Sequence, residues 1–301
     1  MVESGKRMEQ LKSYLRRLSE GEILDSVRAD FMREFKDVDA VEIMEAEQQM
    51  IKEGMPITEV QKLCDIHSAL FHGATLEEKI ANARQPVDVT SLREERAEKT
   101  RKLVETTGHP LFTLTQENEA LEKVIAKIRE QLDRKVTEAA GTGTAVNGSR
   151  NTGENAVSRE LLSEIRELAI HYAKKGDLLY PLLKVKYGIS GPSDVMWTTD
   201  DEIRDELSGL VKAKGQDEAW KQRMERALTR AEEMIYKEAN IFFPNCALNF
   251  TEEEWFGIYR DSKDYPVCFG VENATWEAAE KYLETAKFPI VLKADGLALG
   301  K

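Results

Sequence analysis

Two segments of this chain repeat each other, and this repeat constrains the fold more than any other feature. The runs KKGDLLYP and YKEANIFFP end at Pro181 and Pro244, an offset of 244 − 181 = 63 residues, which pairs Asp177 with Asn240. Each proline lacks a backbone N–H and clashes with the carbonyl group four residues earlier, so it distorts the helix that contains it. Two such helices predict a bundle built from a duplicated hairpin.

Apolar residues recur at helical spacing along most of the chain, which predicts an all-α fold. Turn signals between the helices divide the chain into a small N-terminal helical domain, a helical connector, a four-helix bundle and a C-terminal part, at residues 8–75, 76–107, 108–250 and 251–301. A separate family resemblance of the last run divides this C-terminal part into an extension, 251–273, and a terminal segment, 274–301. Gly, Asn, Ser and Thr dominate residues 141–158, which predicts a flexible loop inside the bundle. The apolar run after Lys287 predicts a short strand-like tail.

The composition excludes several classes of function. The formal net charge is −12 and no basic patch stands out, so we expect no nucleic-acid partner. The chain shows no signal peptide and no run of roughly 18 apolar residues, so we expect a cytoplasmic protein without a membrane partner. Its three cysteines, Cys64, Cys246 and Cys268, have no CxxC spacing, which argues against disulfides and a thiolate zinc site.

The four histidines are the main functional signal. His109 opens the first predicted bundle helix and His171 lies on the second, so both can point into a core where metal ligands project from facing helices. The alternative for His171 is an ordinary buried histidine that is bonded to a backbone carbonyl. In the N-terminal domain, His67 fits a core edge and His72 fits a helix C-terminus.

Longer motifs resemble a known family. The bundle region is similar to the hemerythrin-like cation-binding (HHE) family in the runs HYAKKGDLLYPLL, YGISGPSDVMW, DDEIR and YKEANIFFP. The N-terminal region is similar to the domain of unknown function 438, to which that family is fused, in the runs REFKDVDAVEIMEAEQQMIKEGMP and VQKLCDIHSALFHG. The resemblance implies a four-helix bundle whose members often carry two non-haem iron atoms on His, Glu and Asp ligands.

The resemblance also implies a ligand set. His109 and His171 match the ligands of the first and second helices, and Asp200 lies near the third-helix position. Two further acids of the family fall on Gly176 and Ala239, which cannot bind a metal. The candidate ligands are therefore His109, His171, Asp200 and Glu238, with Asp177 in reserve. Because a di-iron site needs more ligands than these, the resemblance implies a degraded site in which reversible oxygen binding is not expected.

The terminal segment has a resemblance of its own. The run ATWEAAEKYLETAKFPIVLKADGLALGK is similar to the part of phosphoribosylamine–glycine ligase, a purine-biosynthesis enzyme, that enters its ATP-grasp domain. This implies that Lys293 and Lys301 contact nucleotide phosphates beside a turn at Gly296 and Gly300, where glycine lets the backbone approach an anion. ATP and Mg²⁺ would bind only in a complete ligase, so we expect a truncated fusion or a joining artefact.

Three hypotheses for the function follow. The first is a non-enzymatic hemerythrin-like sensor that binds a metal ion or small diatomic ligand in the bundle and signals to a protein partner through its N-terminal domain. The second is a metal-free helical interaction scaffold. The third is an ATP-dependent ligase of which this chain holds a fragment.

Overall fold

Helices make up the protein as it is described by a computed structural model. The structure describes residues 2–23, 26–27, 30–31, 46, 48–56, 91–138, 156–189 and 191–286. Among these residues the strand-type pairing is limited to one bridge between Cys268 and Val271, which confirms the all-α fold class. The predicted loop 141–158 falls mostly outside the described residues, as do Cys64, His67, His72 and the predicted strand-like tail.

The N-terminal region begins with α1 (Val2–Ser19). Its buried face forms a small core of its own, made of Leu11, Tyr14, Leu15, Leu18, Val27, Phe31, Ala46 and Met50. Lys12 is also buried there, and its ammonium group pairs with the carboxylate of Glu53 at 2.6 Å. This local core supports a separate N-terminal helical unit, although the predicted boundaries at residues 8 and 75 stay a prediction.

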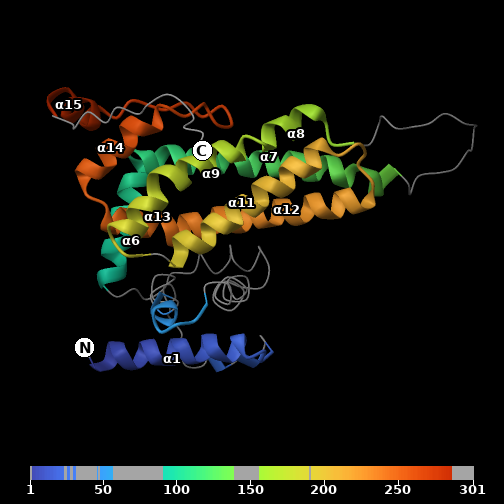
Figure 1. Cartoon of the computed structure of the whole chain (residues 1–301). Coiled ribbons are helices and arrows are strands. Elements are labelled where there is room, and N and C mark those ends of the chain that lie inside the picture. The colour runs from blue at the N-terminus through green and yellow to red at the C-terminus, as the bar shows by residue number, and fades with distance from the viewer. Residues whose placement is uncertain are drawn as a thin grey trace, which may run out of the picture.

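Four helical rods form the bundle, which Figure 1 shows with the rods lying alongside one another. The first rod is α7 (Pro110–Glu138) and the third is α11 (Gly191–Lys212). The second rod joins α8 (Arg159–Ile165), α9 (Leu168–Lys174), η1 (Lys175–Leu179) and α10 (Tyr180–Val185). The fourth joins α12 (Glu218–Lys237), η2 (Glu238–Phe242) and α13 (Phe243–Asn249).

The elements η1 and η2 are π-helical turns, and they preserve the sequence repeat. They begin at Lys175 and Glu238, an offset of 238 − 175 = 63 residues. The backbone N–H of Tyr180 donates to the carbonyl of Lys175, five residues earlier, and the next helix has Pro181 near its start. Because proline has no N–H, the ordinary spacing of four residues cannot continue through it. The predicted helix distortion at both prolines is thereby confirmed.

Three more helices close one end of the bundle. They are α6 (Ser91–Glu105), α14 (Glu252–Ser262) and α15 (Glu277–Thr285), and α6 packs against α13 and α7. Trp255 of α14, together with Trp276 and Ala279, belongs to the same buried core as the four rods. The predicted division at residue 274 therefore does not coincide with a break in packing, because the start of the terminal segment is part of this core.

Within the described ranges, no helix has both the length and the apolar character that crossing a bilayer requires.

Candidate functional site

Charged and polar side chains from all four rods meet in the buried centre of the bundle. Each is at most 5% exposed, and they are Glu117 and Asn118 of α7, His171 and Lys174 of α9, Lys175 of η1, Asp200 of α11 and Glu238 of η2. His171 and Lys175 are four residues apart, so they lie on the same face of their rod. Charges buried this deeply are tolerated only when they are paired and hydrogen-bonded.

His171 bridges two carboxylates. Its Nδ1 lies 2.7 Å from Oε2 of Glu117, and its Nε2 lies 2.9 Å from Oε2 of Glu238. An ionised carboxylate only accepts hydrogen bonds, so both ring nitrogens must carry a proton and donate. Burial by itself would lower the pKa of His171, but the charge of Glu238 and the bonds to both carboxylates outweigh it and raise that pKa to about 9. His171 is therefore a buried cation at neutral pH.

Two lysines supply the other positive charges. The ammonium group of Lys174 donates to Oε1 of Glu117, and that of Lys175 donates to Oε1 of Glu238 and, at 3.1 Å, to Oδ1 of Asp200. Burial would raise the pKa of Glu238, but Lys175 and His171 outweigh it and lower that pKa to about 2. For Asp200 burial prevails over Lys175, and its pKa rises to about 6.

The remaining carboxylate oxygens of the centre are also occupied. Tyr180 donates its hydroxyl to Oδ2 of Asp200 at 2.8 Å, and Asn118 donates its amide to Oε2 of Glu238 at 2.7 Å. All six carboxylate oxygens of Glu117, Asp200 and Glu238 thus accept a hydrogen bond from the protein itself. Three carboxylates face three cations, so the centre is balanced in charge.

His109 lies elsewhere, at the start of α7. Its Nδ1 accepts the backbone N–H of Leu111 at 3.1 Å, which makes it the helix cap. Its ring lies between Trp255 and Trp276, with centroid distances of 4.6 and 4.7 Å, and burial lowers its pKa to about 3. Eight residues separate it from Glu117, about 12 Å along a helix axis. The structure therefore does not bring His109 to the other candidate ligands.

Asp177 is also separate from the centre. Its side chain is exposed and accepts the hydroxyl of Tyr265 at 2.7 Å. The repeat-related residues that contact each other are Lys175 and Glu238. They come one residue before Gly176 and Ala239, the positions on which two acids of the resembled family fall. Lys175 and Glu238 are the first residues of the two π-helical turns.

Sequence reasoning found three members of this centre, His171, Asp200 and Glu238, but missed the rest. Glu117 and Asn118 interrupt the apolar positions of α7 between Leu114 and Leu121, where a core-facing helix should be apolar, and this was a usable signal. Lys174 and Lys175 gave no such signal, because adjacent lysines usually mark a solvated face.

The fold and this centre define a class of protein, a four-helix bundle with a buried polar site of the kind that holds metals in other bundles. Two family models match parts of the chain. Residues 109–246 match the hemerythrin HHE cation binding domain, and residues 11–77 match a family of unknown function, DUF438. No curated protein and no solved structure matches the chain. Neither family match reaches residues 274–301, so the ligase resemblance of that segment stays a prediction.

A metal ion would need lone pairs that point at it, and the centre offers few. Both nitrogens of His171 donate to carboxylates, and the carboxylate oxygens are taken by ammonium, amide, hydroxyl and imidazolium groups. Asn118 Oδ1 is buried without a hydrogen-bond partner, but that is one ligand atom where a metal needs about four. In the described part of the chain, no group of three or more His, Cys, Asp or Glu is arranged to hold a metal. The residues present do not fit the ion.

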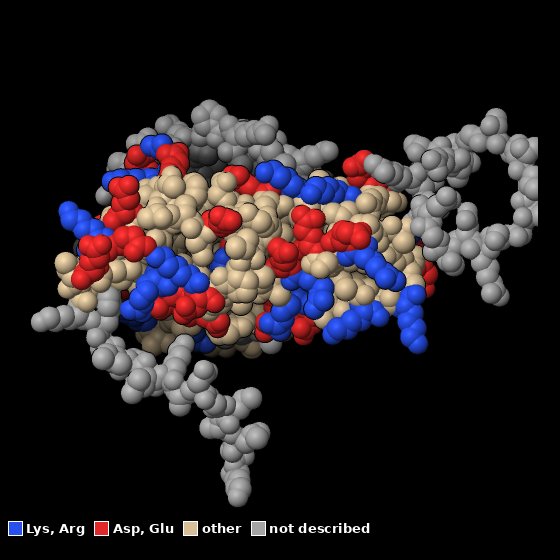
Figure 2. Space-filling model, turned by 90° about the horizontal axis from the view of Figure 1, so that it is seen from above, with Lys and Arg blue, Asp and Glu red and all other residues tan. Residues whose placement is uncertain are grey.

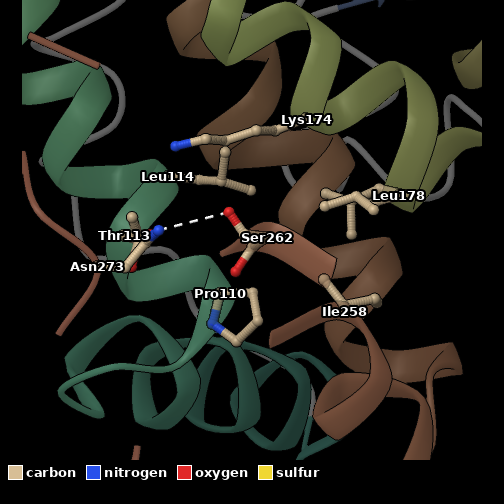
Figure 3. Close-up of a pocket in the computed structure, with 9 residues that line it drawn as sticks. Pro110, Thr113, Leu114, Lys174, Leu178, Ile258, Ser262 and Asn273 are labelled. Carbon is tan, nitrogen blue, oxygen red and sulfur yellow. Dashed lines mark hydrogen bonds between the residues drawn. The ribbon is translucent and has the colours of Figure 1, made fainter. Parts of the chain in front are cut away.

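A small pocket lies near the centre, between α7, η1 and α14 (Figure 3). Its lining is mostly apolar and includes Leu114, Leu178 and Ile258, while Lys174 crosses one side with its nitrogen turned towards α7. Asn273 and Ser262 join at its edge through a hydrogen bond of 3.4 Å. The cavity of about 20 Å³ has room for a water molecule but not for an organic substrate.

Proposed function

We propose that this protein is a non-enzymatic hemerythrin-like module whose cation site has lost its metal and is filled by its own side chains. In this proposal the bundle is a helical sensor or interaction scaffold that acts together with its DUF438 region. The observation that carries the proposal is the position of the Lys175 ammonium group between Asp200 and Glu238, where it satisfies both carboxylates. A site whose carboxylate oxygens and imidazole nitrogens are all engaged does not offer the several ligand atoms that a metal needs.

One further observation supports a role without catalysis, and a second concerns partners. The pocket beside Lys174 is too small for an organic substrate, and the ammonium group of Lys174 is engaged by Glu117. The face in Figure 2 mixes Lys and Arg with Asp and Glu, and no large patch of one sign covers it. With a net charge of −12, such a surface supports the expectation that nucleic acid is not a partner. A protein partner and a cytoplasmic location stay predictions.

Metal analysis tests the proposal. The full chain is produced in medium supplemented with iron, manganese and zinc, purified without chelators, and measured by elemental analysis. Anaerobic titration with Fe²⁺, followed by absorption and by thermal unfolding, covers the case of metal loss during purification. We expect no stoichiometric metal and an unchanged Tm, because a ligand that binds only the native state would raise it. Stoichiometric iron with a raised Tm would overturn the proposal.

Cation binding is the second candidate, and the gathering of three carboxylates and His171 in one place favours it. It requires both lysines to leave the centre, and the same titration decides it. The ligase alternative rests on Lys293, Gly296, Gly300 and Lys301, which lie outside the described residues. Titration of the full chain with ATP and Mg²⁺ tests that alternative.

A further inference from the structure

The two halves of the duplicated hairpin put opposite charges at the same position. Lys175 opens η1 and Glu238 opens η2, and these repeat-related residues form an ion pair across the bundle. Lys175 is fully buried, and its ammonium group also lies 4.2 Å from the ring centroid of Tyr172, in the geometry of a cation–π contact. One hairpin therefore supplies the cation for an acid that the other hairpin supplies.

We infer that the Lys175 ammonium group is the resident cation of the bundle and holds Asp200 and Glu238 together as a divalent metal ion would. This inference rests on the proposed metal-free function and assigns the exclusion of metal to one residue. It implies that Glu117, Asp200 and Glu238 are still placed to hold a metal ion. Replacing Lys175 by a carboxylate residue should therefore allow a divalent ion to bind between them.

Charge supports this assignment. At present the three carboxylates Glu117, Asp200 and Glu238 face the three cations His171, Lys174 and Lys175. The substitution Lys175→Glu makes this four carboxylates against two cations, a net charge of −2 in a buried site. A divalent metal ion would neutralise that charge. An oxygen-rich site with one imidazole suits Fe²⁺, Mn²⁺ or Zn²⁺, and metal binding would also release the imidazolium proton of His171.

The test compares three full-length proteins: the wild type, Lys175→Glu and Lys184→Glu. Lys184 lies on the same rod in α10, is exposed, and pairs with Asp194, so it gives the same change of charge outside the centre. Each protein is titrated anaerobically with Fe²⁺ and with Zn²⁺, and bound metal is measured after desalting. We expect stoichiometric metal and a metal-dependent rise of Tm in Lys175→Glu alone. A folded Lys175→Glu protein that retains no metal would overturn the inference.

A second variant covers the case in which Lys175→Glu does not fold. Lys175→Ala removes the ammonium group and leaves a cavity, which added ethylammonium can fill. We expect ethylammonium to raise the Tm of Lys175→Ala well above its effect on the wild type, and sodium at equal ionic strength to give no such rise. Equal effects of the two salts on both proteins would overturn the inference. Metal in the wild type would instead overturn the proposed function, so the two failures are distinguishable.

Discussion

The bundle contains two buried histidines whose pKa values shift in opposite directions. His109 is 0% exposed and His171 is 1% exposed, yet the pKa of the first falls to about 3 while that of the second rises to about 9. His109 lies between two indole rings with no carboxylate beside it, so burial alone acts and favours the neutral ring. His171 lies between Glu117 and Glu238, and their charges overcome the same burial.

The difference shows what burial does and does not decide. A buried histidine that retains a lone pair can cap a helix or bind a metal. His109 caps a helix, because its Nδ1 accepts the N–H of Leu111. A buried histidine that is protonated is itself a cation and competes with metal ions for the same carboxylates. In this bundle the histidine at the carboxylates is the protonated one, and the neutral one is at the helix start. His171 therefore has no lone pair for a metal, and His109 has no carboxylate beside it to share one.

The largest expected effect comes from breaking the charge balance around His171. Glu117→Gln keeps the shape of the side chain but leaves His171 and Lys174 without their shared anion. Breaking a buried ion pair typically costs 3–5 kcal/mol, so we expect the free energy of unfolding in urea to fall by about 4 kcal/mol. The matched control is Glu119→Gln, which changes an exposed residue of the same helix and should cost under about 0.5 kcal/mol. Similar losses in both variants would contradict the paired centre.

The neutral histidine is the next target. His109→Ala removes a ring that packs between Trp255 and Trp276 together with the cap of α7, so we expect a loss of about 3 kcal/mol. His109→Asn keeps an acceptor for the N–H of Leu111 and should recover about 1 kcal/mol of this loss. Urea unfolding of the two variants measures the difference, and an alanine variant as stable as the wild type would rule out this structural role.

The pH dependence of stability separates the two histidines by sign. The folded-state pKa of His109 is lowered to about 3 from 6.5, so its contribution is present above pH 6.5 and is lost as pH falls towards 3. At pH 5 the stability lost through His109, relative to neutral and higher pH, is about 2 kcal/mol. The folded-state pKa of His171 is raised from 6.5 to about 9, so its contribution is present below pH 6.5 and is lost as pH rises through 9.

Urea unfolding of the wild type and His109→Asn across pH 4 to 10 checks these signs. The acid-side loss should be smaller in the variant by the amount assigned to His109, whereas the loss above pH 7 should remain. A wild type and a variant with parallel curves on the acid side would show that His109 does not titrate as described.

The smallest expected effect concerns the start of α14, the helix whose Trp255 packs against His109. Thr251 begins α14 with a capping box, in which its hydroxyl accepts the N–H of Glu254 and its own N–H donates to the Glu254 carboxylate. Thr251→Ala should cost about 1 kcal/mol, because one N–H of the first turn loses its acceptor. Thr251→Ser, which retains the hydroxyl, is the control. Equal stability of the alanine and serine variants would show that the cap contributes nothing.

Much of the fold could be predicted because its causes are local. The prolines at positions 181 and 244 distort any helix that contains them, and the 63-residue repeat placed both distortions before the structure did. The site was less accessible. The resemblance aligned two acids of the family with Gly176 and Ala239, but it did not indicate that Lys175 and Glu238, one residue earlier in each copy, meet across the bundle.

The roles of individual residues depended on contacts between distant segments. His109 was predicted to start a helix, but the burial of its ring depends on Trp255 and Trp276, which lie far along the chain. Lys175 points inwards because Asp200 and Glu238 come from two other rods. A single sequence does not report which side chains such rods bring together.

The most direct test of the centre is the protonation of its histidine. Nitrogen-resolved NMR of the full chain, with His171→Gln and His109→Asn to assign the signals, reports each ring nitrogen separately at neutral pH. We predict that both nitrogens of His171 carry protons, while His109 is neutral with its proton on Nε2. A lone pair on either nitrogen of His171, or a bound metal there, would contradict a bundle whose cations are its own side chains.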